Sequence, residues 1–238
     1  MSNIVLDSGP IISLTSSNLL FILKEFHEKM DVNFIIPESV KFEVVDRAFQ
    51  NKVYITEALE VLKYVNDEII QVEKHENIRI LMELILTLSN NLFYSEDKPI
   101  QILHEGEAEV FALSLYKNVN VLVIDEVPAR MLIEDIEGLK NHLENKLHSK
   151  IRINEENKQI IEEKFKDRFC IRSSELVVYA YELGFFNDYK QLNYDPYFNA
   201  ENKEALLLEG LLWLLKKNGC SITEEEIYQI INYELKQK

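Results

Sequence analysis

The strongest indication of a fold lies in the stretch IVLDSGPII, residues 4–12. Its three apolar residues, Ile4-Val5-Leu6, are followed at once by Asp7, Ser8 and a Gly-Pro pair, a combination that favours a sharp turn. A short apolar run bounded by such residues is typical of a strand buried inside a parallel sheet. We therefore expect a strand that ends at Asp7 and places its carboxylate at the edge of the sheet.

The residues that follow alternate between helix-like and strand-like patterns. Apolar residues at helical spacing over 19–26 predict a helix that a polar residue among 16–18 could cap. Residues 34–36 are apolar and end at Pro37, which predicts a second strand, and the valines over 40–45 open a second amphipathic helix. The order strand, helix, strand, helix argues for an α/β fold with a parallel sheet.

The same periodicities extend through most of the chain. They predict helices over most of 56–91 with a short strand near 68–72, a polar break at 94–99, a helix over 104–116, a buried strand over 119–124, and a last strand and helix over 169–171 and 173–183. Residues 138–166 are charged and poor in core-forming residues, so they predict a helical insertion or an exposed helical hairpin.

Two further helices are expected at the C-terminal end. A connector rich in Tyr and Asn follows Asp188, and the first helix covers about 201–217. The second starts in Ser221-Ile222-Thr223-Glu224, a capping-box pattern. We therefore expect an α/β domain over 1–190, with its insertion at about 138–166, and a C-terminal helical extension over 191–238.

Composition restricts the class of protein and its surroundings. The chain has 238 residues, two cysteines far apart in sequence and a formal net charge of −15. These values exclude a disulfide scaffold and low-complexity disorder, and they favour a globular protein of the reducing cytoplasm. The apolar stretch 205–215 contains Glu209 and Gly210 and falls short of the roughly 20 residues of a membrane span, so no membrane association is expected. The acidity argues against binding of nucleic acid by bulk electrostatics.

Four acids occupy positions that a parallel sheet would bring together. Asp7 and Asp125 follow apolar strands, and Glu43 and Glu107 lie near the starts of helices. Each acid alone is more often a cap, turn or solvated residue. Together they are expected at the sheet edge where ligands of α/β proteins bind. Clustered carboxylates repel one another unless a cation neutralises them, so the pattern predicts a hard divalent metal, Mg²⁺ or Mn²⁺.

A set of short motifs carries a resemblance to a known family. The motifs are IVLDSGPII at 4–12, IPESV at 36–40 with Glu43, GEAE at 106–109, VIDE at 123–126 with Ala129-Arg130, and the closing segment 170–186. They resemble the successive motifs of the PIN domain, and the layout is similar to archaeal PIN-domain proteins with a C-terminal helical extension. The resemblance implies a PIN-like α/β/α sandwich and a metal-dependent endoribonuclease that cuts single-stranded RNA.

The resemblance also implies roles for individual residues. Asp7, Glu43, Glu107 and Asp125 match the family's four acids, and hence its catalytic and metal-binding positions. Glu109 competes with Glu107, because the two lie about 200° apart around one helix and only one can face the site squarely. Glu126 could supplement Asp125. Many family members have a hydroxyl residue two places after the first acid, where this chain has Gly9.

Contacts to RNA are expected from isolated cations. The candidate phosphate-binding residues near the acids are Lys41, Arg47, Lys52, Arg130 and Arg172, and those expected to contact RNA are Lys41, Arg47 and Arg130. Arg130 matches an arginine of the family. The sequence contains no basic stripe with interleaved aromatic residues.

Alternative functions remain open at this point. A haloacid-dehalogenase-type phosphatase requires a second Asp two residues after the first, where Gly9 stands. A PIN-like fold that serves as a catalytically silent binding or scaffold protein keeps an acidic surface for a protein partner. The toxin of a toxin-antitoxin pair would share the chemistry, although minimal toxins are usually shorter. The apolar helix at 205–215 predicts core packing first, and a homo-oligomer interface second.

Overall fold

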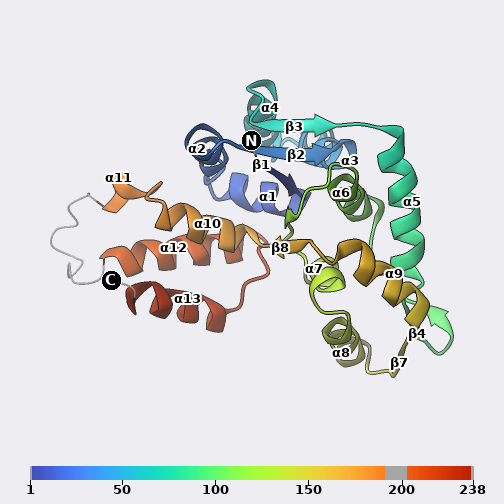
Figure 1. Ribbon diagram of the computed structural model, residues 1–238. Coiled ribbons are helices and arrows are strands. Elements are labelled where there is room, and N and C mark those ends of the chain that lie inside the picture. Colours follow the sequence, from blue (N-terminus) through green and yellow to red (C-terminus); the bar gives the residue numbers. More distant parts are fainter. Residues whose placement is uncertain (1, 191–202, 237–238) are drawn as a thin grey trace.

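The computed structural model describes residues 2–190 and 203–236, and its centre is a five-stranded sheet covered by helices (Figure 1). Strand order is β3-β2-β1-β6-β8, and every neighbouring pair is parallel. The strands are β1 (Ser2–Leu6), β2 (Val32–Pro37), β3 (Ile70–Glu73), β6 (Val121–Val123) and β8 (Phe169–Ile171). The predicted α/β/α sandwich with a central parallel sheet is confirmed.

The chain winds outward from β1 in both directions. β2 and β3 lie on one side of β1, and β6 and β8 lie on the other. The register pairs Ile4 with Phe34 and Leu6 with Val123. A doubly wound sheet of this kind has its switch point between β1 and β6, where the carboxyl ends of strands leave a crevice for ligands. Asp7 and Asp125 both follow the strands that flank this point.

Helices connect the strands and cover both faces of the sheet. Those of the first half are α1 (Ser8–Ser16), α2 (Phe21–Met30), α3 (Glu38–Lys41), the π-helical turn η1 (Phe42–Arg47), the 3₁₀ turn η2 (Ala48–Gln50), α4 (Ile55–Asn66) and α5 (Glu76–Asn90). Those that follow are α6 (Glu105–Tyr116), α7 (Val127–Glu134), α8 (Ile136–Leu147), α9 (Glu155–Phe165), α10 (Ser173–Glu182) and α11 (Asn187–Lys190).

The start of α1 differs from the sequence prediction. The residues after Asp7 do not form a separate turn, because α1 begins at Ser8 and Asp7 is its N-cap residue. Pro10 is tolerated there because backbone N–H groups in the first turn of a helix have no acceptor within the helix, so the N–H that proline lacks is not needed. The candidate caps at 16–18 lie at the end of α1 and after it, and α2 begins later, at Phe21, after Leu20 as N-cap residue.

A small second sheet replaces two predicted features. The expected polar break at 94–99 contains β4 (Phe93–Ser95) and β5 (Lys98–Pro99), and the expected insertion contains β7 (Ile151–Ile153). These strands form an antiparallel sheet in the order β5-β4-β7. The expectation of an exposed helical hairpin over 138–166 is therefore wrong. Its apolar residues are few but well buried: Leu139, Leu143, Ile151, Ile161 and Phe165 belong to the core.

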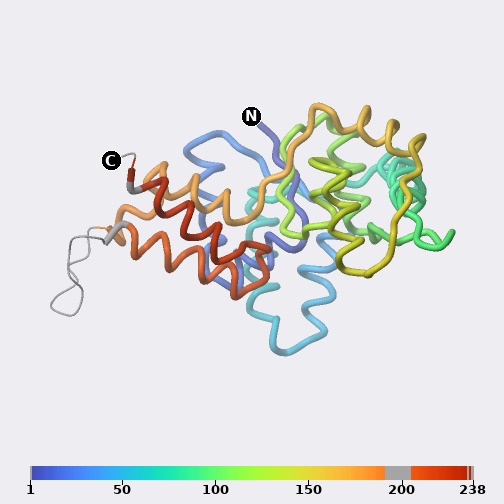
Figure 2. Tube along the Cα trace, turned by 90° about the horizontal axis from the view of Figure 1, so that it is seen from below, coloured from blue at the N-terminus to red at the C-terminus, as the bar shows by residue number. Residues whose placement is uncertain are grey.

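The C-terminal helices pack against the rest of the chain. α12 (Lys203–Lys217) and α13 (Glu224–Lys236) lie beside α10 in both views (Figures 1 and 2). Leu208, Leu212 and Leu215 of α12 are buried within this chain, as expected of core packing. Most of the predicted Tyr- and Asn-rich connector lies outside the described residues.

The capping box of the last helix uses other residues than predicted. Thr223 and Glu226, not Ser221 and Glu224, form the reciprocal pair: the Thr223 N–H donates to Glu226 Oε2 at 2.7 Å, and the Glu226 N–H donates to Thr223 Oγ1 at 3.2 Å. The Ser221 hydroxyl instead donates to the backbone carbonyl of Asp125. Among the described residues, no helix is long and apolar enough to cross a lipid bilayer.

Candidate active site

Asp7 is the buried centre of an acidic cluster. It is 5% exposed at the end of β1, and its backbone N–H donates to Val123 O at 3.0 Å. Burial raises the pKa of the Asp7 carboxyl to about 7, against the lowering effect of a hydrogen bond from the Ser8 backbone, and the negative charges of Glu43, Glu126 and Asp125 raise it further. The structure thus places three other acids within electrostatic reach of Asp7.

Glu107 joins this cluster and Glu109 does not. Glu107 is in the first turn of α6, where its Oε2 accepts the His104 backbone N–H at 2.7 Å. Burial raises the pKa of the Glu107 carboxyl to about 7, the His104 hydrogen bond lowers it, and Glu126 and Asp7 raise it. Glu109 instead accepts the Ser39 N–H at 3.0 Å, at the start of α3. The rotation of α6 therefore directs Glu107 toward Asp7.

Asp125 is held by hydrogen bonds from three separate elements. Its Oδ1 accepts the Ser173 N–H at 2.7 Å, and its Oδ2 accepts the hydroxyls of Ser173 and Ser13 at 2.8 and 2.9 Å. Its backbone carbonyl accepts the Ser221 hydroxyl. These serines come from α1, α10 and the turn before α13, and nothing in the local sequence pattern identified them. Asp125 is the most firmly positioned acid of the cluster.

Glu126 has a larger place in the site than the sequence suggested. It is exposed at the N-cap position of α7, and its side chain hydrogen-bonds to Glu107 as well as acting on Asp7. Sequence reasoning treated it as a supplement to Asp125. The structure brings it toward Glu107, while the Asp125 carboxylate is occupied by serine donors.

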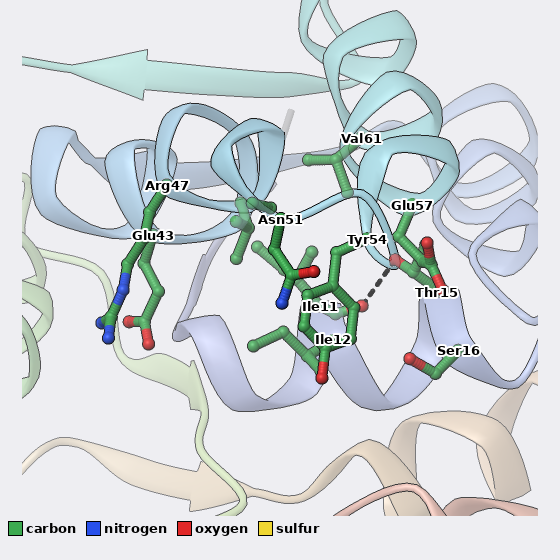
Figure 3. A pocket seen from close by; sticks show the side chains of 12 residues that line it. Ile11, Ile12, Thr15, Ser16, Glu43, Arg47, Asn51, Tyr54, Glu57 and Val61 are labelled. Atoms are coloured by element: carbon green, nitrogen blue, oxygen red, sulfur yellow. Dashed lines mark hydrogen bonds between the residues drawn. The ribbon is translucent and has the colours of Figure 1, made fainter.

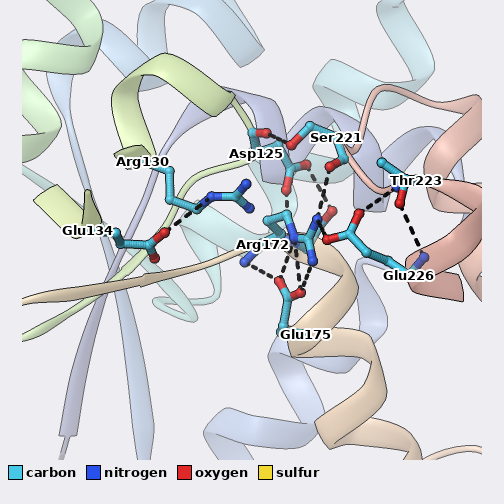
Figure 4. A network of polar contacts seen from close by, with 9 residues as sticks. Asp125, Arg130, Glu134, Arg172, Glu175, Ser221, Thr223 and Glu226 are labelled. Carbon is cyan, nitrogen blue, oxygen red and sulfur yellow. Dashed lines mark hydrogen bonds and ion pairs between the residues drawn. The ribbon is translucent and has the colours of Figure 1, made fainter. Parts of the chain in front are cut away.

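The predicted RNA-binding cations occupy different surroundings. Lys41 Nζ lies 2.7 Å from Asp46 Oδ2 in an ion pair. Arg130 Nε lies 3.6 Å from Glu134, with only 16% of the Arg130 side chain exposed (Figure 4). Arg47 is exposed and lines two cavities near the acids. Of Lys41, Arg47 and Arg130, Arg47 is therefore the best placed to meet a ligand.

Arg172 is a structural residue rather than an RNA contact. It is 7% exposed and bonds to Glu175 of its own helix turn, to Glu226 Oε1 of α13 at 2.9 Å and to the Ser221 carbonyl at 3.0 Å (Figure 4). This network joins α10 to the C-terminal helices. Because Ser221 also donates to Asp125, the network ends at the acidic cluster.

Two cavities lie on either side of η1 and share Glu43 and Arg47. The first, of about 420 Å³, is between α1, η1 and α4 (Figure 3). The second, of about 690 Å³, is lined by residues of η1, α5 and the start of α6, including His104 and Glu105. Turns of π-helix often occur at functional sites, and the segment containing η1 and η2 projects from the body of the protein (Figure 2). Glu43 lines both cavities, and its negative charge acts on Asp7.

The acidic cluster suits a divalent cation by its chemistry. Within residues 2–190 and 203–236, no three His, Cys, Asp or Glu side chains already form a group that could hold a metal ion. The donors are nevertheless all carboxylate oxygens, the kind that Mg²⁺ and Mn²⁺ prefer. Asp7 is buried and Glu107 is half-buried beside like charges, and a cation would offset that repulsion. These residues therefore fit the metal that the sequence predicted.

The metal-free protein is expected to lose stability as the pH rises from about 4 to about 7. In the folded state the pKa of Asp7 and of Glu107 is about 7, whereas in the unfolded chain the two carboxyls have their ordinary pKa values of 3.8 and 4.5. The folded state therefore binds more protons in this interval, so the free energy of unfolding falls with pH. Urea unfolding in EDTA at pH 5 and pH 8 measures the effect.

The matched control for this pH dependence is Asp7→Asn, which removes one of the two titrations. Its loss of stability between pH 5 and pH 8 should be smaller than that of the wild type. Mn²⁺ should stabilise the wild type more at pH 8 than at pH 5, because metal ligands must be deprotonated. Equal pH dependence in both proteins would show that Asp7 does not titrate in this interval.

Comparison with known proteins agrees with this geometry. A family model described as a PIN domain, DUF3368, matches residues 3–142, more than half of the chain. The match includes Asp7, Glu43, Glu107 and Asp125. No curated protein and no solved structure matches the chain. PIN domains are generally nucleases that use divalent metal ions. With this match and an α/β/α sandwich whose acids meet at the switch point of the sheet, the chain belongs to the PIN-domain family.

Proposed function

We propose that this protein is a metal-dependent endoribonuclease that hydrolyses phosphodiester bonds of single-stranded RNA. One observation carries the proposal: at the carboxyl ends of β1 and β6, the charges of Glu43, Glu126 and Asp125 act on Asp7, and those of Glu126 and Asp7 act on Glu107. A protein that used this crevice for packing alone would have no reason to bury carboxylates beside one another, because like charges disfavour the folded state.

Asp7 and Glu107 would hold Mg²⁺ or Mn²⁺, with Glu43, Glu126 and the one remaining lone pair of the Asp125 carboxylate around them. The chemistry supplied by such a cation is Lewis-acid activation of water and stabilisation of the negative charge on the phosphate. Ser13 and Ser173 orient Asp125 through their hydrogen bonds.

Binding of the RNA strand is assigned to local contacts. Arg47 lies between the two cavities, where it can bind a phosphate next to the acids. With a net charge of −15, the chain has no general attraction for RNA, and we expect weak, salt-sensitive binding. The cytoplasm, where single-stranded RNA is available, remains the proposed location.

Exchange of Glu107 for Gln should slow metal-dependent cleavage on the order of a hundredfold, the scale for loss of one charged group at a reacting phosphate. The assay is incubation of purified protein with mixed single-stranded RNA and Mn²⁺ or Mg²⁺, and EDTA should stop the reaction. Glu109→Gln is the matched control, because Glu109 lies on the same helix but binds Ser39. It should keep nearly full activity.

The opposite pattern would identify Glu109 as the acid of the site. Absence of cleavage by the wild-type protein with either metal would remove the nuclease proposal.

A catalytically silent binding protein is the second candidate. It is favoured by Asp125, whose carboxylate already accepts three hydrogen bonds, and by the absence of a formed metal-binding group among the described residues. A toxin with a protein partner would share the nuclease chemistry. The cleavage assay separates these candidates: a silent protein binds a partner or RNA without hydrolysis, whereas a toxin cleaves RNA and is inhibited by its partner.

A further inference from the structure

We infer that the cavity between α1, η1 and α4 binds an unpaired nucleobase of the RNA strand. The inference deepens the proposed function, since it takes single-stranded RNA as the ligand and assigns it a base-binding site. The cavity volume of about 420 Å³ lies within the range of about 300–1,000 Å³ that is typical of small-molecule sites. Glu43 lines the cavity (Figure 3), and its charge acts on Asp7, so the cavity is connected to the acidic cluster through Glu43.

The cavity offers apolar surface and an aromatic ring. Ile11, Ile12, Val44 and Val61 form apolar walls, and the Tyr54 side chain lines the same cavity (Figure 3). Tyr54 is 50% exposed and Ile12 is 43% exposed, values that leave large apolar side chains open to a ligand. Unstacked bases of single-stranded RNA bind in this manner, stacked on aromatic rings.

The cavity also offers a polar edge. Asn51 Oδ1 accepts the Val53 backbone N–H at 3.1 Å, which orients the amide and leaves its NH₂ group to donate. Glu57 Oε2 accepts the Thr56 hydroxyl at 2.9 Å, and its second oxygen can accept from a ligand. A nucleobase edge carries both donors and acceptors, so it matches this pair. A purely apolar ligand would leave both groups unpaired.

Charge decides which part of a nucleotide enters. Glu43 and Glu57 both line the cavity, and their carboxylates would repel a phosphate. Arg47 lines the same cavity and also the second one, across η1. The base is therefore placed inside, between Tyr54 and the apolar walls, and the phosphate outside, near Arg47 and the acids.

This arrangement accounts for RNA binding by an acidic protein. Affinity that comes from stacking needs no neutralisation of phosphates, and every base has a face that can stack. A chain of net charge −15 can therefore hold a single strand by its bases where it cannot attract the backbone.

The test is binding of a fluorescently labelled single-stranded oligoribonucleotide in EDTA, measured by anisotropy. Tyr54→Ala should weaken binding about tenfold, and Tyr54→Phe should preserve it within about twofold, because the ring supplies the stacking energy. Tyr228→Ala is the matched control: Tyr228 is 51% exposed, but it lies on α13, away from the cavity, and its removal should have no effect.

A second measurement identifies the part of the nucleotide that is bound. Saturation-transfer NMR with the four ribonucleoside monophosphates should show contact at the base protons with wild-type protein and lose it with Tyr54→Ala. Ribose 5-phosphate should show no comparable contact. Equal binding of RNA by wild type and Tyr54→Ala, or signals from ribose 5-phosphate as strong as those from the nucleotides, would overturn the inference.

The outcomes for the cavity and for the nuclease are independent. Tyr54-dependent binding without cleavage in Mn²⁺ would retain the base site and reject the nuclease. Cleavage that is abolished by Asp7→Asn, together with RNA binding that is insensitive to Tyr54, would retain the nuclease and reject the base site.

Discussion

Asp7→Asn is expected to stabilise the metal-free protein at pH 8 and to abolish metal-dependent RNA cleavage. Burial and the neighbouring acids raise the pKa of Asp7 from 3.8 to about 7. At pH 8 the folded protein therefore carries a buried negative charge at a cost in stability, and the neutral Asn removes that cost. Each pKa unit corresponds to about 1.4 kcal/mol, so a shift from 3.8 to about 7 predicts a gain of about 4 kcal/mol in the free energy of unfolding.

Cleavage should be lost because Asn cannot supply the charge that holds a divalent cation. Urea unfolding in EDTA and the RNA assay with Mn²⁺ measure the two effects on one preparation. A gain in stability together with a loss of activity is expected where the residues of an active site destabilise the folded state.

Asp125→Asn is the matched substitution with the opposite expected effect on stability. The Asp125 carboxylate accepts hydrogen bonds from the Ser173 N–H and from the hydroxyls of Ser173 and Ser13. Replacement by Asn removes the negative charge that strengthens these three hydrogen bonds, and the loss is expected to be about 2 kcal/mol. If both variants shift stability in the same direction, then the distinction between a repelled acid and a hydrogen-bonded acid is wrong.

Arg172→Ala is expected to lower the free energy of unfolding by about 3 kcal/mol, the upper end for hydrogen bonds to charged groups, because Arg172 is buried while the Glu175 and Glu226 side chains are each 37% exposed. Arg172 is 7% exposed, and its removal leaves Glu175 and Glu226 without their cation and the Ser221 carbonyl without its donor. Urea unfolding measures the loss, and limited proteolysis should show faster cleavage within the C-terminal helices.

Arg152→Ala is the control for Arg172→Ala. Arg152 pairs with Asp97 at 3.5 Å, but both side chains are mostly exposed, so the expected change is below about 1 kcal/mol. Since Ser221 joins the Arg172 network to the Asp125 carbonyl, Arg172→Ala should also weaken Mn²⁺ binding measured by electron paramagnetic resonance. Unchanged proteolysis with unchanged stability would show that the network does not hold the C-terminal helices.

Much of the fold follows from local patterns. The apolar runs that form β1, β2, β6 and β8 are followed by an acid, a proline or a capped helix. Such patterns involve only a few neighbouring residues, so they can be recognised from the sequence. The small sheet of β4, β5 and β7 was missed, because its strands have two or three residues each and β7 pairs with β4 across more than fifty positions. Such short strands exist only because a partner strand is present.

The candidate site divides in the same way. The sequence alone was sufficient to place acids at the carboxyl edge of a parallel sheet, since the end of a strand and the start of a helix are local features. Packing chose Glu107 over Glu109, because the facing side of α6 depends on how that helix rests on the sheet. The contacts of Asp125 with Ser13 and Ser173 join residues 112 and 48 positions apart. Only the folded chain brings them within hydrogen-bond distance, because such pairings depend on topology and not on local periodicity.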